Sequence, residues 1–537
     1  MRKKIYQLHR RLSIIIAAPV LLWAISGFMH PTMTNIRPAI ATQGIPPTVV
    51  DSARLRYPLT EALQKHHMDS VTNVRLVHID TNWFYQVQPA RGDVPVYLSC
   101  TNGNVLTAGD WLYAQYLARQ FLEGPTQSTH ASMSPEAHAH MNQVPPAHLD
   151  PTVHFASSTT AVHDCCGAAT ETVLNPVKGA KVANVSLVRT YNKEYKSINR
   201  LLPVYCVSFE RPDGIRIYVE TTQDRFSFAM DNRRAIFDEI FRLCHTWGWL
   251  DFLGKGRLAV EVLVALTALL TTILGIYIFF TTRAAKAKGN GLVTARRNHR
   301  WTAIVASLFT LMWTFSGSFH AFSKFSGDPH DQQRTPDRFA AASTAIDWPR
   351  LTQACPRPIT NISLVQMAGV TYWRAVLLPQ HIAAHKDLMK DAKTAMTPVA
   401  YVRTSDYTVL ENGDAKYAAE LSTAYSGHRP EDILSTTPVT SFSDEYNFTD
   451  KRLPVWKVSY AANAHERLYI ETGTGKLASR VNDRSVVEGY SFALFHKHHF
   501  MDWAGKSVRD ASTMFWVFVQ VVMASFGLML WFRRRRR

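Results

Sequence analysis

Four uncharged apolar runs constrain the fold of this 537-residue chain more than any other feature. They cover residues 12–29, 262–282, 301–319 and 511–532. Each run is long enough to cross a bilayer as a helix. The first run continues into SGFMHPTM, which lacks the small-x-small site of a cleaved signal peptide. We therefore expect four membrane spans, with the first one retained.

Basic residues concentrate beside these runs. Residues 1–11 carry five Lys and Arg, residues 283–300 carry six, and residues 533–537 are five Arg, with no acid in any of the three stretches. They account for 16 of the net charge of +17. This distribution is a positive-inside signal and not a nucleic-acid footprint. We expect a multi-pass protein of the bacterial inner membrane, with both termini cytoplasmic and residues 31–255 and 321–505 periplasmic.

The second half of the sequence repeats the first. LHRRLSIIIAAPVLLWAISGFMH is matched by NHRWTAIVASLFTLMWTFSGSFH at a constant offset of 290. Further on, PVYCVSFERPDGIRIYVETTQDR, from Pro203, is matched by PVWKVSYAANAHERLYIETGTGK, from Pro454, at an offset of 251. The second match holds without a gap through Asp251 and Asp502, and it then leads into the second and fourth spans. Each half is therefore expected to contain a helix, an external domain and a second helix.

Each external stretch is expected to contain two small α+β units. Residues 73–106 and 184–225 both read as an apolar-alternating strand, a turn and another strand, and a helical stretch such as 59–67 precedes them. The predicted fold is a membrane α-helical protein with four transmembrane helices in duplicated two-helix halves and periplasmic α+β domains. The expected boundaries are 1–30, 31–255, 256–282, 283–300, 301–320, 321–505, 506–532 and 533–537.

Histidines bracket the first and third spans in the same way. His9 and His30, like His299 and His320, are 21 residues apart, a rise of about 31 Å on a helix. Each of these helices would carry one imidazole at each membrane face, the layout of a transmembrane haem electron carrier. The alternative is that these histidines are interfacial polar anchors. A third matched pair precedes the second and fourth spans, so the candidate ligands are His9, His299, His30, His320, His245 and His496.

The predicted topology assigns these histidines to two sites. His9 and His299 lie at the cytoplasmic face, where they are the only two candidates. The other four lie at the outer face. There the pairing stays open among His30 with His320, His245 with His496, and cross-pairs. Neutral imidazole is a common ligand of haem iron, and this set of histidines suits two or three haems.

An insertion at about 125–178 distinguishes the first half from the second. It is rich in His, Met, Ser, Thr, Ala and Pro, and its composition suits either a flexible linker or a segment that binds copper or zinc. The second half lacks it, so it cannot be essential to a mechanism that both halves share. The candidate metal ligands within it are His130, His138, His140 and Met141.

The order of these motifs resembles the PepSY-associated transmembrane family, which includes bacterial iron-regulated membrane proteins and siderophore reductases. The resemblance rests on the opening His-Arg, the Ser-Gly-x-x-His exit, the strand pair ending YVETTQDR or YIETGTGK, and LCH or LFH before the closing span. Known siderophore reductases of this family hold b-type haem between transmembrane helices and pass electrons outward. The resemblance therefore implies a haem-b protein that reduces a ferric siderophore or another periplasmic metal chelate in iron uptake.

Two other functions compete with this expectation. One is a non-enzymatic membrane-anchored PepSY module that binds or inhibits a periplasmic partner. The other is copper or iron handling through the insertion. The chain holds no P-loop, HExxH motif or dinucleotide fingerprint in a strand–turn–helix context. An electron donor, quinol or a reductase, would therefore be external, and the expected partners are the lipid bilayer, that donor and the chelate, with no nucleic acid.

Overall fold

The computed structural model describes residues 2–33, 36–92, 94–124, 179–283, 291–326, 334–380 and 395–535. The chain divides into two compact units. The first, called the helical unit here, comprises Met1–Arg37, Asp231–Pro329 and Val481–Arg537. The second, called the sheet unit, comprises Pro38–Met230 and His330–Arg480. The insertion at 125–178, with its candidate ligands, lies outside the described residues.

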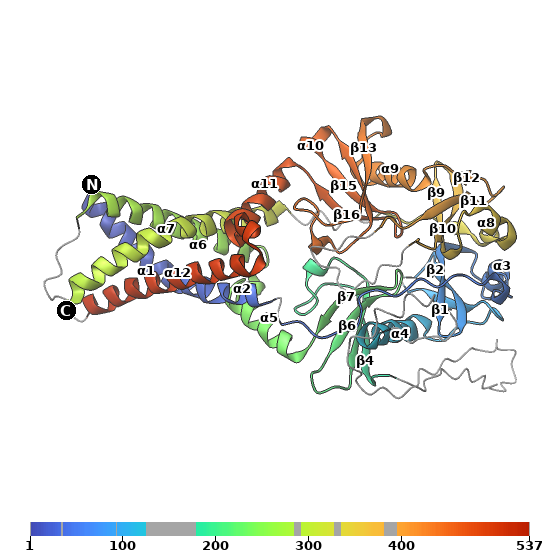
Figure 1. The fold of residues 1–537 in the computed structure, drawn as a ribbon, viewed down its shortest axis with the longest axis horizontal. Helices are drawn as coiled ribbons and strands as arrows, with labels where there is room; N and C mark the ends of the chain where they lie inside the picture. The colour runs from blue at the N-terminus through green and yellow to red at the C-terminus, as the bar shows by residue number, and fades with distance from the viewer. Residues whose placement is uncertain are drawn as a thin grey trace. The chain divides into compact units, whose positions relative to one another are not determined.

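Four long apolar helices form the helical unit. Among the described residues these four are the candidates for crossing a membrane by length and composition. Helices α1 and α7 each contact both α6 and α12, so the four form a bundle (Figure 1). Their bounds are α1 Arg2–Gly27, α6 Gly256–Thr281, α7 Gly291–Ser323 and α12 Lys506–Arg535.

Short helices and turns lie at one end of this bundle, next to the long helices in sequence. Helix α5 contacts α1, and α11 contacts α7. The turn η11, which contains His496, is a π-helical turn, a form that often occurs at functional sites. The bounds are α2 Met29–Thr32, α5 Asn232–Cys244, η5 Gly248–Leu253, η6 Lys324–Ser326, α11 Asp483–Ser491, η11 Phe492–His496 and η12 His499–Ala504.

The helical unit is larger than the apolar runs indicate. Helix α7 begins at Gly291, so part of the stretch 283–300, which we expected to be a loop, is helical. Arg300 stabilises the end of α6, because its guanidinium donates to the carbonyl of Thr282 at 2.5 Å and also to that of Phe279. Helices α5 and α11 belong to this unit, although we assigned their residues to the external domains.

The described residues of the sheet unit form four antiparallel sheets, two in each half of the chain. The first-half sheets have the strand orders β3-β2-β1-β8 and β4-β5-β6-β7. The second-half sheets have the orders β12-β11-β10-β9 and β13-β14-β15-β16. The first-half strands are β1 Ser70–Ile79, β2 Asn82–Pro89, β3 Val96–Ser99, β4 Val182–Val188, β5 Val204–Phe209, β6 Arg216–Glu220 and β7 Arg225–Met230.

The second-half strands and the remaining helices complete this unit. The strands are β8 Phe339–Ala340, β9 Ile359–Met367, β10 Val370–Leu377, β11 Val399–Arg403, β12 Val409–Leu410, β13 Ile433–Val439, β14 Val455–Tyr460, β15 Arg467–Glu471 and β16 Lys476–Val481. The helices are α3 Leu59–Lys65, α4 Gly109–Glu123, α8 Trp348–Ala354, α9 Gly413–Ser426 and α10 Ala462–His465. The 3-10 turns are η2 Ser52–Arg54, η4 Ser197–Asn199, η8 Ala341–Thr344, η9 Pro430–Asp432 and η10 Phe448–Asp450.

One helix packs across the two sheets of each half. Helix α4 contacts β3 of one sheet and β4, β5 and β6 of the other, and α9 contacts β11, β13, β14 and β15. The buried face of α4 includes Leu117, Ala118 and Phe121. The burial of these apolar side chains joins the paired sheets into one core in each half.

The two halves of the sheet unit exchange segments. Strand β8 of the second half pairs with β1, with Val71 opposite Phe339. In the opposite direction, Val50 of the first half donates its N–H to the carbonyl of Ile359 at 2.8 Å. Asn361 also bonds both main-chain groups of Leu76, at 2.9 and 3.0 Å. Neither half therefore completes its backbone hydrogen bonds alone.

A buried ion cluster also joins the halves. Arg225 of the first half and Arg452 of the second both donate to the carboxylate of Glu471, which is 4% exposed. Burial alone would raise the pKa of Glu471, but the two guanidinium groups hold it well below its ordinary value. A carboxylate with a depressed pKa contributes stability above its unfolded pKa and loses that contribution as the pH falls.

Glu471→Gln should therefore destabilise the chain, because it removes the carboxylate that Arg225 and Arg452 share, and among the described residues only Arg225 keeps a second one, Glu220. We expect a loss of about 3–5 kcal/mol of unfolding free energy at neutral pH. The loss should shrink as the pH falls below about 4, where the unfolded carboxyl is protonated. Denaturant unfolding in detergent measures this. Glu431→Gln, which removes one of two exposed partners of Arg429, is the matched control. Equal midpoints for the two variants would contradict the assignment.

Candidate functional site

One end of the bundle holds His9 and His299. It is called the basic end here, because α1 and α7 begin there with Lys and Arg (Figure 1). The Nδ1 atom of His9 lies 3.0 Å from the carbonyl oxygen of Thr271 on α6, and that of His299 lies 3.2 Å from the carbonyl oxygen of Met523 on α12. A carbonyl oxygen can only accept, so Nδ1 carries the proton in both rings. The lone pair of each imidazole is therefore on Nε2.

Two glycines make room for these rings. Gly275 and Gly527 each follow the accepting carbonyl by one helical turn. A Cβ atom at Gly275 would lie 3.2 Å from Cε1 of His9, and one at Gly527 would lie 3.3 Å from Cε1 of His299. Each imidazole thus rests against the backbone of the neighbouring helix. His9 is also close enough to His299 to affect it electrostatically.

The opposite end of the bundle brings the other four histidines together, and it is called the histidine-rich end here. The ring centroids of His30 and His245 are 6.2 Å apart, and those of His245 and His496 are 6.3 Å apart. His30 and His320 also act electrostatically on His496. The four candidates from the sequence are therefore neighbours in the structure.

Two phenylalanines at an offset of 251 pack between these rings. Phe241 stacks on His245, with centroids 4.6 Å apart, and contacts His30 edge-on. Phe492 stacks on both His496 and His320, at 4.6 and 4.3 Å. Each half of the chain thus fixes its two histidines against one aromatic ring.

Serine side chains set the tautomer of two of these histidines. The Oγ atom of Ser26 lies 2.9 Å from Nδ1 of His245, and that of Ser316 lies 3.3 Å from Nδ1 of His496. Each hydroxyl donates its own proton to a main-chain carbonyl. Ser26 donates to the carbonyl of Leu22 at 2.7 Å, and Ser316 donates to that of Trp313 at 3.3 Å. The serine oxygens therefore accept from Nδ1–H, and Nε2 again carries the lone pair.

A carboxylate side chain contacts the ring of His320. The Nδ1 atom of His320 lies 2.5 Å from Oε1 of Glu488 on α11. At the offset of 251, the first half has Phe237 in the place of Glu488. His320 is therefore held by a charged group, whereas His245 and His496 are held by hydroxyls.

Burial keeps the imidazoles outside the spans neutral. Burial, assisted by His30, lowers the pKa of His245 to about 3. Burial also lowers the pKa of His496 well below its ordinary value, with further contributions from His245, His30 and His320. Both rings are therefore unprotonated bases at neutral pH, which is the form that binds a metal ion.

Four of these histidines share one feature of metal-bound histidines. A metal-bound histidine normally donates its other ring N–H to an oxygen, and His9, His299, His245 and His496 do so. Among the described residues, the hydrogen bonds of these four rings are made by Nδ1 and not by Nε2. No group of three or more His, Cys, Asp or Glu in the described part of the chain is arranged to hold a metal ion. The four rings thus share the hydrogen-bond pattern of metal-bound histidines.

His498 differs from these histidines. It is fully buried, its Nδ1 lies 3.3 Å from Oγ1 of Thr513, and its Nε2 is enclosed without a partner. Its ring stacks on Trp313, with centroids 5.5 Å apart and an interplanar angle of 4°. Trp247, at the matching position, stacks in the same way on Trp23 at 4.7 Å. His498 occupies the place of an aromatic core residue, not that of a ligand.

Trp23 of span one and Trp313 of span three also contact the main chain at His245 and His496. Nε1 of Trp23 donates to the carbonyl of His245 at 3.0 Å, and Nε1 of Trp313 donates to that of His496 at 3.3 Å. These two hydrogen bonds fix the main chain at His245 and His496.

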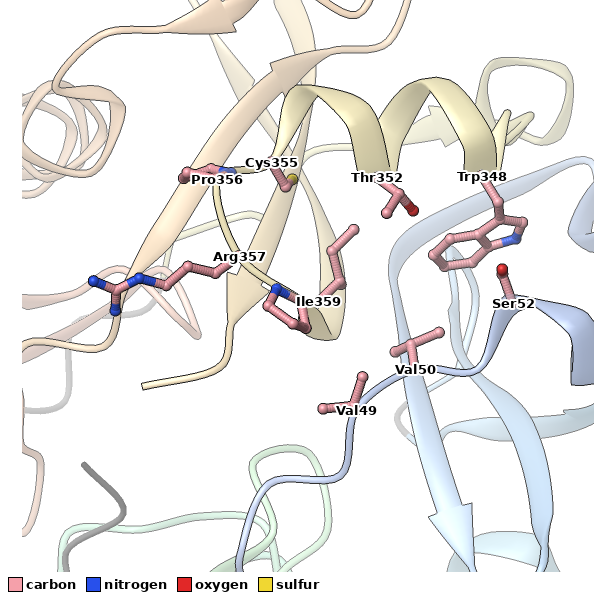
Figure 2. Close-up of a pocket in the computed structure, with 10 residues that line it drawn as sticks. Val49, Val50, Ser52, Trp348, Thr352, Cys355, Pro356, Arg357 and Ile359 are labelled. Carbon is pink, nitrogen blue, oxygen red and sulfur yellow. The ribbon is translucent and has the colours of Figure 1, made fainter. Parts of the chain in front are cut away.

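A pocket of about 290 Å³ lies in the sheet unit where its two halves meet. Figure 2 shows Val50 and Ser52 on one side, and Trp348, Cys355 and Ile359 on the other. None of the residues that we predicted to bind a cofactor or metal lines this pocket. The four cysteines among the described residues, Cys100, Cys206, Cys244 and Cys355, are unpaired.

Together, the four apolar helices and the sheets define a multi-pass membrane protein with an α+β unit. Residues 107–386, just over half of the chain, match the family described as PepSY-associated TM region. The chain belongs to this family. A comparison with curated proteins found no match.

The stacking of His498 on Trp313 generates a prediction. His498→Phe keeps an aromatic ring in the stack and removes a buried nitrogen that has no partner, so it should leave stability unchanged or raise it by about 1 kcal/mol. His498→Ala creates a cavity and should cost about 2–4 kcal/mol. Thermal unfolding in detergent measures both. If His498→Phe were as damaging as His498→Ala, Nε2 of His498 would have a bound partner.

Proposed function

We propose that this chain is a haem-b electron-transfer protein of the bacterial inner membrane, which reduces a ferric chelate, such as a ferric siderophore, on the periplasmic side. The observation that carries this proposal is the state of the histidines at both ends of the bundle. Their Nδ1 atoms are held by oxygens, and their Nε2 lone pairs are left for a metal ion. Haem iron, when bound, supplies one-electron chemistry that no amino-acid side chain in the bundle offers.

At the basic end, His9 and His299 would be the two ligands. They come from different halves of the chain, on α1 and α7. The carbonyls of Thr271 and Met523 hold both imidazoles in the ligand tautomer, so no proton has to leave either ring when a metal ion binds. The positive-inside distribution of charge supports a cytoplasmic location for this end.

At the histidine-rich end, we favour His245 and His496 as the ligand pair. An imidazole nitrogen binds a transition metal at about 2 Å, which puts the centres of two rings on one metal ion about 6 Å apart. The observed separation of these rings is 6.3 Å. They too come from different halves, and both are held by serine hydroxyls. His30, at 6.2 Å from His245, is the alternative partner.

The pseudo-symmetry of these contacts supports a tandem duplication. Ser26 and Ser316, on spans one and three, hold His245 and His496 by the same contact. The residues that precede the second and fourth spans match at the offset of 251. One duplicated helix pair would thus supply one ligand of each pair, which gives a site at each side of a hydrocarbon layer roughly 30 Å thick.

The substrate would be iron in a periplasmic chelate. Adding one electron converts Fe(III) to Fe(II), which siderophores hold far more weakly, so the iron is released. The electron would come from quinol or a separate reductase, because the chain has no dinucleotide motif. The residues of the bundle contribute ligand identity, tautomer and burial, which are the protein's means of setting a haem potential.

Alanine variants of the histidines test this proposal. His9→Ala and His299→Ala should each remove the same fraction of the haem, and His245→Ala and His496→Ala should each remove the complementary fraction. Haem is measured against protein by the pyridine haemochrome assay on purified detergent samples. His66→Ala, in the sheet unit, is the control and should keep full haem content. If all four ligand variants kept the wild-type haem content, both sites would be wrong.

A further inference from the structure

We propose that two turns of the helical unit insert their aromatic side chains into the lipid headgroup layer at the histidine-rich end. They are η5 (Gly248–Leu253) and η12 (His499–Ala504), called the aromatic turns here. They match each other at the offset of 251. This inference concerns membrane docking and does not depend on the haem proposal.

Both turns present large apolar rings outward. Phe252 is 80% exposed and Trp503, at the matching position, is 84% exposed. Trp249 and its match Phe500 are 54% and 42% exposed. A soluble surface seldom displays four such rings on two short turns, because each would leave a large apolar area in water. The exposed rings therefore indicate a partner that accepts apolar groups.

The position of the turns identifies that partner as lipid. Helix α6 begins at Gly256 and α12 at Lys506, only three and two residues after the respective turns end. Side chains so close to the start of a membrane span lie at the level of the headgroups. Tryptophan is favoured in that layer, since its ring is apolar and its N–H can bond to a headgroup or water.

Ion pairs hold the turns in place. Asp251 accepts from Arg242 at 2.9 Å and from Arg257 at 2.5 Å. Asp502 accepts from Arg509 at 2.5 Å. Each turn is thus fastened to the helix that follows it. The outward rings are therefore carried by a fixed backbone.

Each aromatic turn also follows a histidine of the histidine-rich end closely in the sequence. His245 precedes η5 by three residues, and His496 precedes η12 by three residues. Trp247, between His245 and η5, is buried and stacked on Trp23. Anchoring both turns in the headgroup layer would therefore set the depth of the histidine-rich end of the bundle.

Quenching by brominated lipids tests this inference. The full chain is placed in nanodiscs of phosphatidylcholine brominated either near the glycerol end of the acyl chains or near their terminal methyl group. Trp249→Phe with Trp503→Phe should reduce the emission that shallow bromines quench and leave the emission that deep bromines quench unchanged. Trp111→Phe, which removes an exposed tryptophan of the sheet unit, is the control and should change neither. Equal thermal midpoints in detergent show that the variants are folded.

Two results would overturn the inference. In the first, the double variant leaves shallow quenching unchanged while it reduces quenching by aqueous acrylamide, which would mean that the rings face water. In the second, shallow quenching is unchanged and the double variant alters the oligomeric state in the nanodisc, which would mean that a second copy covers the turns.

Discussion

The contact on which the helical unit depends is the hydrogen bond from an imidazole Nδ1–H to an oxygen on a neighbouring helix. At the basic end it joins α1 to α6 and α7 to α12 through main-chain carbonyls. In the low dielectric of a bilayer such a bond is costly to leave unmade, so it orients the ring as well as the helix. Because Nδ1 is committed, Nε2 is the only ring atom left for a ligand. One interaction therefore sets both the contact between the helices and the tautomer of the ring.

In the sheet unit, ion pairs between charged side chains connect the sheets and the two halves of the chain. Arg75 forms two bonds to Asp224, at 3.0 and 2.6 Å, and thereby ties the first sheet to the turn before β7. Arg225 and Arg452 meet at Glu471, across the boundary between the halves of the chain. Together with the exchanged strand β8, these contacts make the two halves of the unit interdependent.

The sequence indicated much of this arrangement, because hydropathy and charge are local properties. The four spans follow from apolar runs, and the family follows from ordered motifs. Other features depend on tertiary contacts. Strand β8 has two residues, too few for a period, and it exists only because β1 accepts it. Glu488 lies 168 residues from His320, so no local pattern could reveal that contact. Gly275 and Gly527 had no assigned role in the sequence, because that role depends on the position of the histidine rings on the neighbouring helices. The insertion at 125–178 remains a prediction from composition.

The central claim is that each end of the bundle holds one bis-imidazole haem. The most direct measurement is the absorption spectrum of the purified full chain from haem-replete cells, oxidised and then reduced with dithionite, together with the ratio of haem to protein. We expect a sharp Soret band, an α band that appears on reduction, and two haems per chain. A colourless protein would contradict the account.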